Sequence, residues 1–320
     1  MPDSRKPNNG YKAVFISPHL DDAVFSCGGT IAQLSATGAV LVINVFTYYP
    51  REFRKRAITA GPERHAEEHS AAQFLGYESL NLEETDAIFR KSIRGSPSRL
   101  FRPPSQIDTA CLATIRGRID EILAGLAYET LYVPMGIGWH VDHVLCHLAT
   151  RHHLGQPSVF MYEDAPYCLV ANATRYRVHE LGRTAQNPAL SPPPSRRGLL
   201  RDWLTTSRSY LGTAPVARIR PSPLRFAAHM VISWYIWSLL AQHLSDPGYN
   251  GLSLRDLTND ISGDFDRKLA ASYLYASQIG EFFMDRRDCL ARYTAYSETM
   301  GKPGYHYERF WKAESGPDIR

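Results

Sequence analysis

Residues 17–22 read SPHLDD and follow AVFI at residues 13–16, an apolar run typical of a buried strand. They precede GGTIA at residues 28–32, which is typical of a helix packed closely on a sheet. His19, Asp21 and Asp22 are therefore predicted in the turn that leaves the carboxyl end of a strand, where open α/β sheets bind ligands. Adjacent carboxylates repel each other, and a metal ion is the simplest compensating charge.

Further apolar runs and helical patterns alternate along the first half of the chain. Residues 39–46 form a second buried strand after a helix over 22–37, which makes a βαβ unit with a right-handed crossover. This alternation predicts an α/β fold, a three-layer Rossmann-like sandwich with a mostly parallel central sheet, plus an insertion and C-terminal helices. Later helices are expected over 62–75 and 107–124, and a further one is expected to end at 149. Later strands are expected over 80–82, 130–134 and 158–162.

The pattern breaks in the second half. Residues 184–223 are rich in proline and arginine and are interpreted as an exposed insertion that is partly mobile. Residues 226–243 predict a strongly apolar helix, which we expect to be buried in this or a partner subunit rather than held at a membrane surface. Residues 266–299 are expected to be helical, and 305–311 close the chain. We expect a single domain over 1–320, with the insertion and apolar helix at 184–245 inside it.

Composition excludes several classes of protein. The chain has 320 residues, 44% hydrophobic and 21% charged, so a core of this size needs no disulfide or structural metal. A net charge of +4 does not indicate a nucleic-acid binder. The five scattered cysteines form no CxxC pair and are interpreted as reduced thiols in a cytoplasmic protein without a signal peptide. CGG at residues 27–29 does not supply the GxGxxG turn of a dinucleotide-binding enzyme.

A second group of metal-binding side chains follows the strand predicted at 130–134. His140 and His143 are three residues apart at the start of a helix, so both imidazoles share one face. In a doubly wound sheet this loop and the loop of residues 19–22 can meet at the switch point. One histidine and one aspartate from the first loop, with one histidine from the second, would leave a coordination position open for water, as catalytic zinc requires. The ligand set suits zinc, with ferrous iron as the alternative.

Each motif also has an ordinary structural interpretation. A histidine pair at this spacing is more often a surface or packing feature, and Asp21 and Asp22 could cap a helix N-terminus. The combination of both motifs, each after a predicted parallel strand, is much more specific. His147 and the pair at 152–153 lie further along and are interpreted as non-catalytic.

The two motifs resemble those of the PIG-L/LmbE-like zinc deacetylase family, whose pattern is Pro-His-Pro-Asp-Asp-Glu followed by His-x-Asp-His. Leu20 replaces the usual proline, and Ala23 replaces a glutamate that is not a zinc ligand in the family. Supporting matches are RHAE at 64–67, LG at 75–76, YASQ at 275–278 and YE at 307–308. The resemblance covers about residues 11–167 and 268–311 and leaves out the insertion.

The resemblance implies a role for eight residues. It makes His19, Asp22 and His143 the zinc ligands, Asp21 the general base, His140 the group that stabilises the tetrahedral intermediate or protonates the amine, and Asp142 the carboxylate that orients a histidine. Arg64 and Asp86 occupy positions that contact the sugar in relatives, while their ordinary interpretations are an exposed helix charge and a loop cap.

The implied mechanism uses zinc to lower the pKa of its water from about 15.7 toward about 7. Asp21 takes the proton, the oxyanion lies between zinc and protonated His140, and the amine receives its proton from Asp21 or His140.

The main functional hypothesis is a zinc-dependent N-deacetylase of an N-acyl amino sugar, or of a sugar-containing small metabolite. Alternatives are a membrane-associated deacetylase of a lipid-linked amino sugar and a non-catalytic binding protein on the same fold. We expect a small-molecule N-acyl amino-sugar substrate, no nucleic acid and no membrane contact, and leave a homo-oligomer open.

Overall fold

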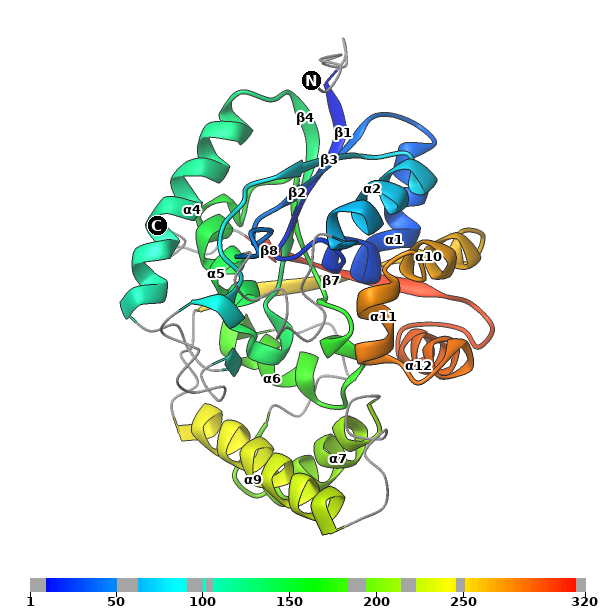
Figure 1. Cartoon of the computed structure of the whole chain (residues 1–320). Helices are drawn as coiled ribbons and strands as arrows, with labels where there is room; N and C mark the ends of the chain where they lie inside the picture. Colours follow the sequence, from blue (N-terminus) through cyan, green and yellow to red (C-terminus); the bar gives the residue numbers. More distant parts are fainter. Residues whose placement is uncertain are drawn as a thin grey trace.

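The structure is a computed structural model that describes residues 10–50, 63–90, 100–101, 106–183, 194–213, 223–245 and 251–314. Its described strands form one eight-stranded sheet in the order β3-β2-β1-β4-β5-β8-β7-β6 (Figure 1). The strand bounds are β1 Tyr11–Ser17, β2 Val40–Asn44, β3 Glu78–Asn81, β4 Tyr128–Pro134, β5 Val159–Tyr162, β6 Gly182–Arg183, β7 Leu252–Asp260 and β8 Tyr307–Glu314.

The five strands β1 to β5 are parallel, and the chain reverses its direction across the sheet at β1. β2 and β3 extend the sheet on one side of β1, whereas β4 and β5 extend it on the other. β1 is buried at every position except Lys12, as its apolar run predicts. The loops that follow β1 and β4 therefore leave neighbouring carboxyl ends, which is the switch point of a doubly wound sheet.

Helices cover both faces of this parallel half (Figure 1). α1, α2 and α10 pack together on one face, and α4 and α5 pack together on the other. The predicted three-layer α/β fold is confirmed. The helix bounds are α1 Asp22–Ser35, α2 Glu63–Leu75, α4 Gln106–Ala124, α5 Val141–Thr150, α6 Ala173–Leu181, α7 Leu199–Leu211, α9 Pro223–Ser245, α10 Phe265–Ser272, α11 Ala276–Phe282 and α12 Arg286–Glu298.

The glycine pair in α1 was expected to let this helix pack closely on the sheet. Its close neighbours are instead Ile261 and Lys268. A Cβ atom on Gly29 would lie 2.7 Å from the Ile261 side chain, and one on Gly28 would lie 3.0 Å from Cγ of Lys268. Ile261 follows β7, and Lys268 is in α10. The glycines therefore allow α10 and the end of β7 to pack directly on α1.

The second half of the chain departs from the sequence prediction in three places. The helix expected over 266–299 is three helices, α10 to α12. β7 was not predicted and pairs antiparallel with β8 from one end to the other. The stretch expected as an exposed insertion contains α7, and α6 precedes it. Residues 184–193 and 214–222 of that stretch lie outside the described residues.

The apolar helix α9 is buried on one side only. Ile236 and Leu240 are buried with Tyr176 of α6, whereas Phe226 and Trp234 are exposed. The expectation of a helix buried in this subunit is therefore right for one face, and its alternative of a partner subunit stays a prediction. Among the described helices, none has the length and apolarity needed to cross a membrane.

The buried carboxylate of Glu308 joins the last strand to the first helix by hydrogen bonds and to α10 by an ion pair. Glu308 of β8 accepts hydrogen bonds from the backbone N–H groups of Gly29 and Thr30 and from the Thr30 hydroxyl. The Lys268 ammonium lies 2.7 Å from Oε1 of the same carboxylate. Glu308 and Lys268 are both buried, so neither charge has water as a substitute partner.

We expect Glu308→Gln to lower the free energy of unfolding by about 3–5 kcal/mol, because it leaves the Lys268 ammonium buried without a countercharge. The glutamine preserves side-chain volume, so no cavity contributes. Urea denaturation measures the change. Glu314→Gln, at the exposed end of the same strand, is the control and should stay within about 0.5 kcal/mol of the wild type. Equal stabilities of all three proteins would contradict this role of Glu308.

Candidate metal centre and active site

The structure brings the two sequence motifs together at the carboxyl ends of β1 and β4. Oδ2 of Asp22, the first residue of α1, lies 2.9 Å from Nδ1 of His19 in the preceding turn. The same oxygen lies 3.2 Å from Nε2 of His143 in α5. One carboxylate oxygen therefore faces one nitrogen of each histidine, and the three donor atoms surround a common point. The donor atoms of these three residues lie within 4.8 Å of one another.

Electrostatics at this point favour a cation. Burial alone would lower the pKa of His19, but the carboxylates of Asp22 and Asp142 outweigh it and hold that pKa well above its usual value. Burial also opposes charge on His143, yet Asp22 and Asp164 raise its pKa to about 9. Burial would raise the pKa of Asp22, but the facing histidines hold it well below its usual range. The buried carboxylates thus attract positive charge, which either a proton or a metal ion supplies.

The residues fit a divalent ion. Nε2 of His143 is buried and, within the described residues, makes no hydrogen bond of normal geometry, although Asp22 is close to it. An unsatisfied buried nitrogen is costly unless it has a ligand to bind. Two imidazole nitrogens and one carboxylate oxygen are a common donor set for zinc, and ferrous iron accepts the same donors.

Each of these histidines is held by a carboxylate at its other ring nitrogen. Nε2 of His19 lies 3.1 Å from Oδ2 of Asp142, and Nδ1 of His143 lies 2.7 Å from Oδ1 of Asp164. Such partners fix the tautomer and ring orientation of a metal-binding histidine. The histidine that Asp142 contacts is His19, and the role of Asp142 in orienting it stays a prediction.

Asp164 was missed by the sequence analysis. Its Oδ2 accepts hydrogen bonds from the backbone N–H groups of Gly136 and Ile137, which places the carboxylate firmly beside His143. A signal existed, because Asp164 lies two residues after the strand predicted at 158–162. The rule that singled out Asp21 and Asp22 applies to it equally.

Asp164→Asn should weaken metal binding by about 10- to 100-fold. The backbone donors of Gly136 and Ile137 require an oxygen, so the asparagine NH₂ must face Nδ1 of His143. That donor moves the imidazole proton to Nε2, which then lacks the lone pair for a ligand. Competition with a chelator measures the affinity. Asp120→Asn, on the surface, is the control; equal metal affinity in the Asp164 and Asp120 variants would contradict this role.

Asp21 precedes the proposed ligand Asp22 in the chain, and its carboxylate is bound by Arg64. Nη2 of Arg64, in the first turn of α2, donates to Oδ1 of Asp21 at 2.8 Å. Burial raises the pKa of Asp21, although the Arg64 guanidinium opposes the shift. Both residues are buried, so the interpretation of Arg64 as an exposed helix charge is wrong.

His140 caps α5 rather than facing Asp22. Its Nδ1 accepts a hydrogen bond from the backbone N–H of Asp142, so its proton is on Nε2. Its ring centroid lies 5.2 Å from that of His19 and 5.3 Å from that of His143. Burial lowers the pKa of His140 well below its usual value. The structure therefore favours a neutral imidazole, in contrast to the protonated form that the sequence analysis expected.

Asp86 and Arg90 close the site on the side of β2. Oδ2 of Asp86 lies 3.8 Å from Nε2 of His19 and 4.0 Å from Nη1 of Arg64. The other carboxylate oxygen of Asp86 accepts from the backbone N–H of Ile88, so the loop-cap interpretation is also correct. Arg90, which the sequence analysis did not single out, forms a 2.6 Å ion pair with Asp142. Arg90 lies on the loop between β3 and α4, and no local motif marks it.

Two other groups among the described residues also have metal-binding geometry. One is His19 with His140 and Asp142, which overlaps the first group. The other is Asp120 with His152 and His153, which stands at the surface on α4 and the 3-10 turn Arg151–His153. Both histidines of the surface group contact Oδ1 of Asp120, at 3.0 and 2.9 Å. Hydrogen bonds to one carboxylate account for that arrangement.

Comparison with known proteins gives one family and several related folds. A sequence profile described as PIG-L: GlcNAc-PI de-N-acetylase matches residues 14–154. A 2'-N-acetylparomamine deacetylase from Streptomyces fradiae is 28% identical over 167 residues, which are 49% of this chain and 57% of that protein. The match therefore spans little more than half the length of this relative.

Two crystal structures show the same fold. The antimicrobial reagent A40926 pseudoaglycone deacetylase Dbv21 superposes with a TM-score of 0.56 at 20% identity, over 94% of this chain and 96% of that one. The zinc-inhibited form of teicoplanin deacetylase Orf2 gives a TM-score of 0.58 at 18% identity, over 96% and 99%. The matched residues 14–154 contain both motifs of the site described above. Over residues 14–154 this chain is accordingly similar to the PIG-L family, and its fold is that of the two deacetylase structures.

Proposed function

We propose that this protein hydrolyses an N-acyl amide on an amino sugar. The proposed acyl group is acetyl. The proposed cofactor is a divalent metal ion, zinc, with ferrous iron as the alternative. The observation that carries the proposal is the meeting of His19, Asp22 and His143 around one point, with Asp21 beside them. The family match and the relative that deacetylates 2'-N-acetylparomamine support the same reaction.

His19, Asp22 and His143 would hold the metal ion. When bound, it supplies Lewis-acid polarisation of the amide carbonyl and acidifies water. Asp142 and Asp164 hold the two histidines in the tautomers that leave a lone pair toward the ion. The site thus has its supporting carboxylates in place around the proposed ligands.

Asp21 is the proposed general base. It adjoins a proposed ligand in sequence, and Arg64 holds one of its oxygens in place. Burial raises its pKa against the opposition of Arg64, which makes the carboxylate a stronger base than an exposed aspartate. Asp21 takes a proton from the attacking water and returns it to the amine nitrogen as the amide bond breaks.

His140 is the proposed donor to the amide oxygen. Its Nδ1 is occupied by the backbone N–H of Asp142, so its Nε2–H is the group that donates. A neutral imidazole stabilises developing negative charge through a hydrogen bond without itself changing charge. Asp86 and Arg64 remain the proposed partners of the sugar hydroxyl groups, because both line the site at His19 and Asp21.

The test is amine release from a panel of N-acetylated amino sugars, with the protein freed of metal and then reloaded with zinc or with ferrous iron. We expect release only from the loaded protein, with acetate and free amine in equal amounts. If neither metal-loaded form releases amine from any member of the panel at full metal occupancy, the proposed function is contradicted.

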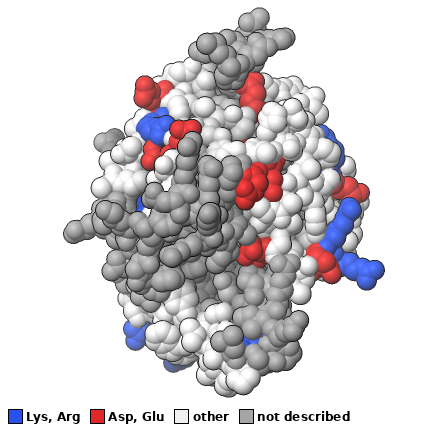
Figure 2. All heavy atoms as spheres, in the orientation of Figure 1, with Lys and Arg blue, Asp and Glu red and all other residues white. Residues whose placement is uncertain are grey.

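One face of the described surface can be compared with that of nucleic-acid-binding proteins. On the face seen in Figure 2, described acidic and basic side chains stand in small separate groups among uncharged ones. A nucleic-acid site needs a basic stripe or patch. Absence of nucleic acid, like the oligomeric state and membrane contact, stays a prediction.

A further inference from the structure

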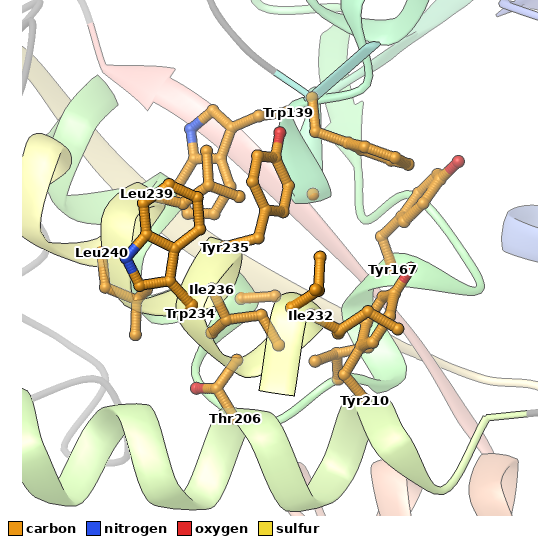
Figure 3. A pocket seen from close by; sticks show the side chains of 15 residues that line it. Trp139, Tyr167, Thr206, Tyr210, Ile232, Trp234, Tyr235, Ile236, Leu239 and Leu240 are labelled. Atoms are coloured by element: carbon orange, nitrogen blue, oxygen red, sulfur yellow. The ribbon is translucent and has the colours of Figure 1, made fainter. Parts of the chain in front are cut away.

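A cavity of about 420 Å³ adjoins the candidate metal centre. Its walls come from α9, α7, the start of α6, the loops that follow β4 and β5 (Figure 3), and Phe101, which precedes α4. Apart from Gly138 and Thr206, every residue that lines it is aliphatic or aromatic. Six aromatic side chains take part: Phe101, Trp139, Tyr167, Tyr210, Trp234 and Tyr235. The volume is in the range of small-molecule sites.

The cavity and the metal centre share a wall. The Tyr167 ring lines the cavity and meets the His143 ring edge to face, with centroids 5.2 Å apart. The Phe101 ring also lines it and lies 5.7 Å from the ring of His140. Trp139 and His140 are consecutive residues, so one loop contributes to both the cavity and the site.

This shared wall is held in place by close packing. Gly138 has a φ of +84°, and a Cβ atom there would lie 2.6 Å from Cγ of Tyr167. The Tyr167 ring therefore rests directly on the backbone of the loop that precedes His140. Two polar groups of the lining are engaged elsewhere: Trp139 donates its indole N–H to Glu180, and Thr206 donates its hydroxyl to the carbonyl of Ala171.

We propose that this cavity binds an aromatic group attached to the amino sugar, so that the substrate is an aromatic glycoconjugate. The inference rests on the proposed function. A sugar alone has few groups that suit a wall built mainly of aliphatic and aromatic side chains, whereas aromatic rings pack edge to face against such walls. Trp234 lines the cavity yet is 66% exposed, so the cavity opens to solvent and admits a group larger than one ring.

The test compares glycosides of N-acetylglucosamine that differ only in the aglycone: methyl, octyl and 2-naphthyl. With the zinc-loaded protein, we expect kcat/KM for the 2-naphthyl glycoside to exceed that for the methyl glycoside by about 10- to 100-fold. Equal values would overturn the proposal. An octyl glycoside as good as the naphthyl one would overturn the aromatic assignment.

α9 offers a matched pair of variants. Trp234→Ala removes an exposed aromatic ring that lines the cavity, and Phe226→Ala removes one that is 70% exposed and does not line it. Both rings are exposed, so neither change should disturb folding. We expect Trp234→Ala to reduce the naphthyl-to-methyl ratio about tenfold and Phe226→Ala to preserve it. An equal fall of the naphthyl-to-methyl ratio in both variants would show that exposed apolar surface in general favours the naphthyl glycoside. That result would overturn the proposal.

A binding measurement separates this inference from the proposed function. 2-Naphthyl glucoside lacks the N-acetyl group, and its fluorescence reports binding without turnover. Amine release from none of the glycosides would count against the proposed function alone. Saturable binding of the naphthyl glucoside that weakens at least tenfold in Trp234→Ala, and not in Phe226→Ala, would still support the cavity assignment. Absence of binding, or equal binding by all three proteins, would overturn it.

Discussion

Asp22→Ala should abolish metal binding and reduce kcat/KM by about 1,000-fold or more, since a metal ion contributes several kcal/mol to the barrier and each 1.36 kcal/mol is a factor of ten. Oδ2 of Asp22 faces both His19 and His143. Its removal takes away the atom shared by the two turns. Metal analysis of the purified variant, together with amine release, measures the effect.

His143→Ala should give the same result, because Nε2 of His143 is the contribution of the second turn to the site. His153→Ala is the matched control, since that histidine belongs to the surface group with Asp120 and is not expected to act in catalysis. The control should retain metal and activity. Wild-type metal content in Asp22→Ala and His143→Ala would remove the ligand assignment.

Asp21→Asn should keep its full metal content, unlike the two ligand variants, while its kcat falls by about 100- to 10,000-fold. Asparagine keeps the shape of the side chain and cannot accept the proton of the attacking water. Arg64 loses its charged partner at 2.8 Å, so thermal denaturation should accompany the kinetics to show that the variant is folded. Metal content and kcat measured on the same sample decide the outcome. Loss of metal along with activity would place Asp21 among the ligands instead.

The parallel half of the fold was predictable because its strands are buried on both faces. β1 and β2 are almost continuous apolar runs, and such runs identify strands of parallel sheets directly. β7 gave no such signal. It runs Leu252–Asp260, alternates buried with exposed positions only at its start, and contains Asp and Asn, which strands generally lack. Its pairing with β8 depends on residues some fifty positions away, which local patterns do not report.

The C-terminal helices show a second limit. Residues 266–299 were expected to be helical without a break, yet the chain turns at Tyr275, the N-cap of α11, and again at Asp285, whose side chain caps α12. Helix-forming residues on both sides of a turn keep the average propensity high. Packing of α10 on the glycines of α1 decides where the chain must bend.

The site was predictable as far as its motifs extend. His19, Asp22 and His143 stand where strand order places them, because β1 and β4 are neighbours. Asp164 contacts His143 and Arg90 contacts Asp142, each from a separate loop, and only the folded chain reveals those contacts. The neutral His140 that the structure favours depends on burial and on the hydrogen bond from the backbone N–H of Asp142, and neither is visible in the motif.

The central claim is that one divalent ion is shared between the turns after β1 and β4. Anomalous diffraction at the zinc absorption edge, from crystals of the zinc-loaded protein, tests it most directly. We predict one strong peak within about 2.0–2.2 Å of donor atoms of His19, Asp22 and His143. A peak only at the surface group of Asp120, His152 and His153, or no peak between the two turns at full zinc occupancy, would contradict it.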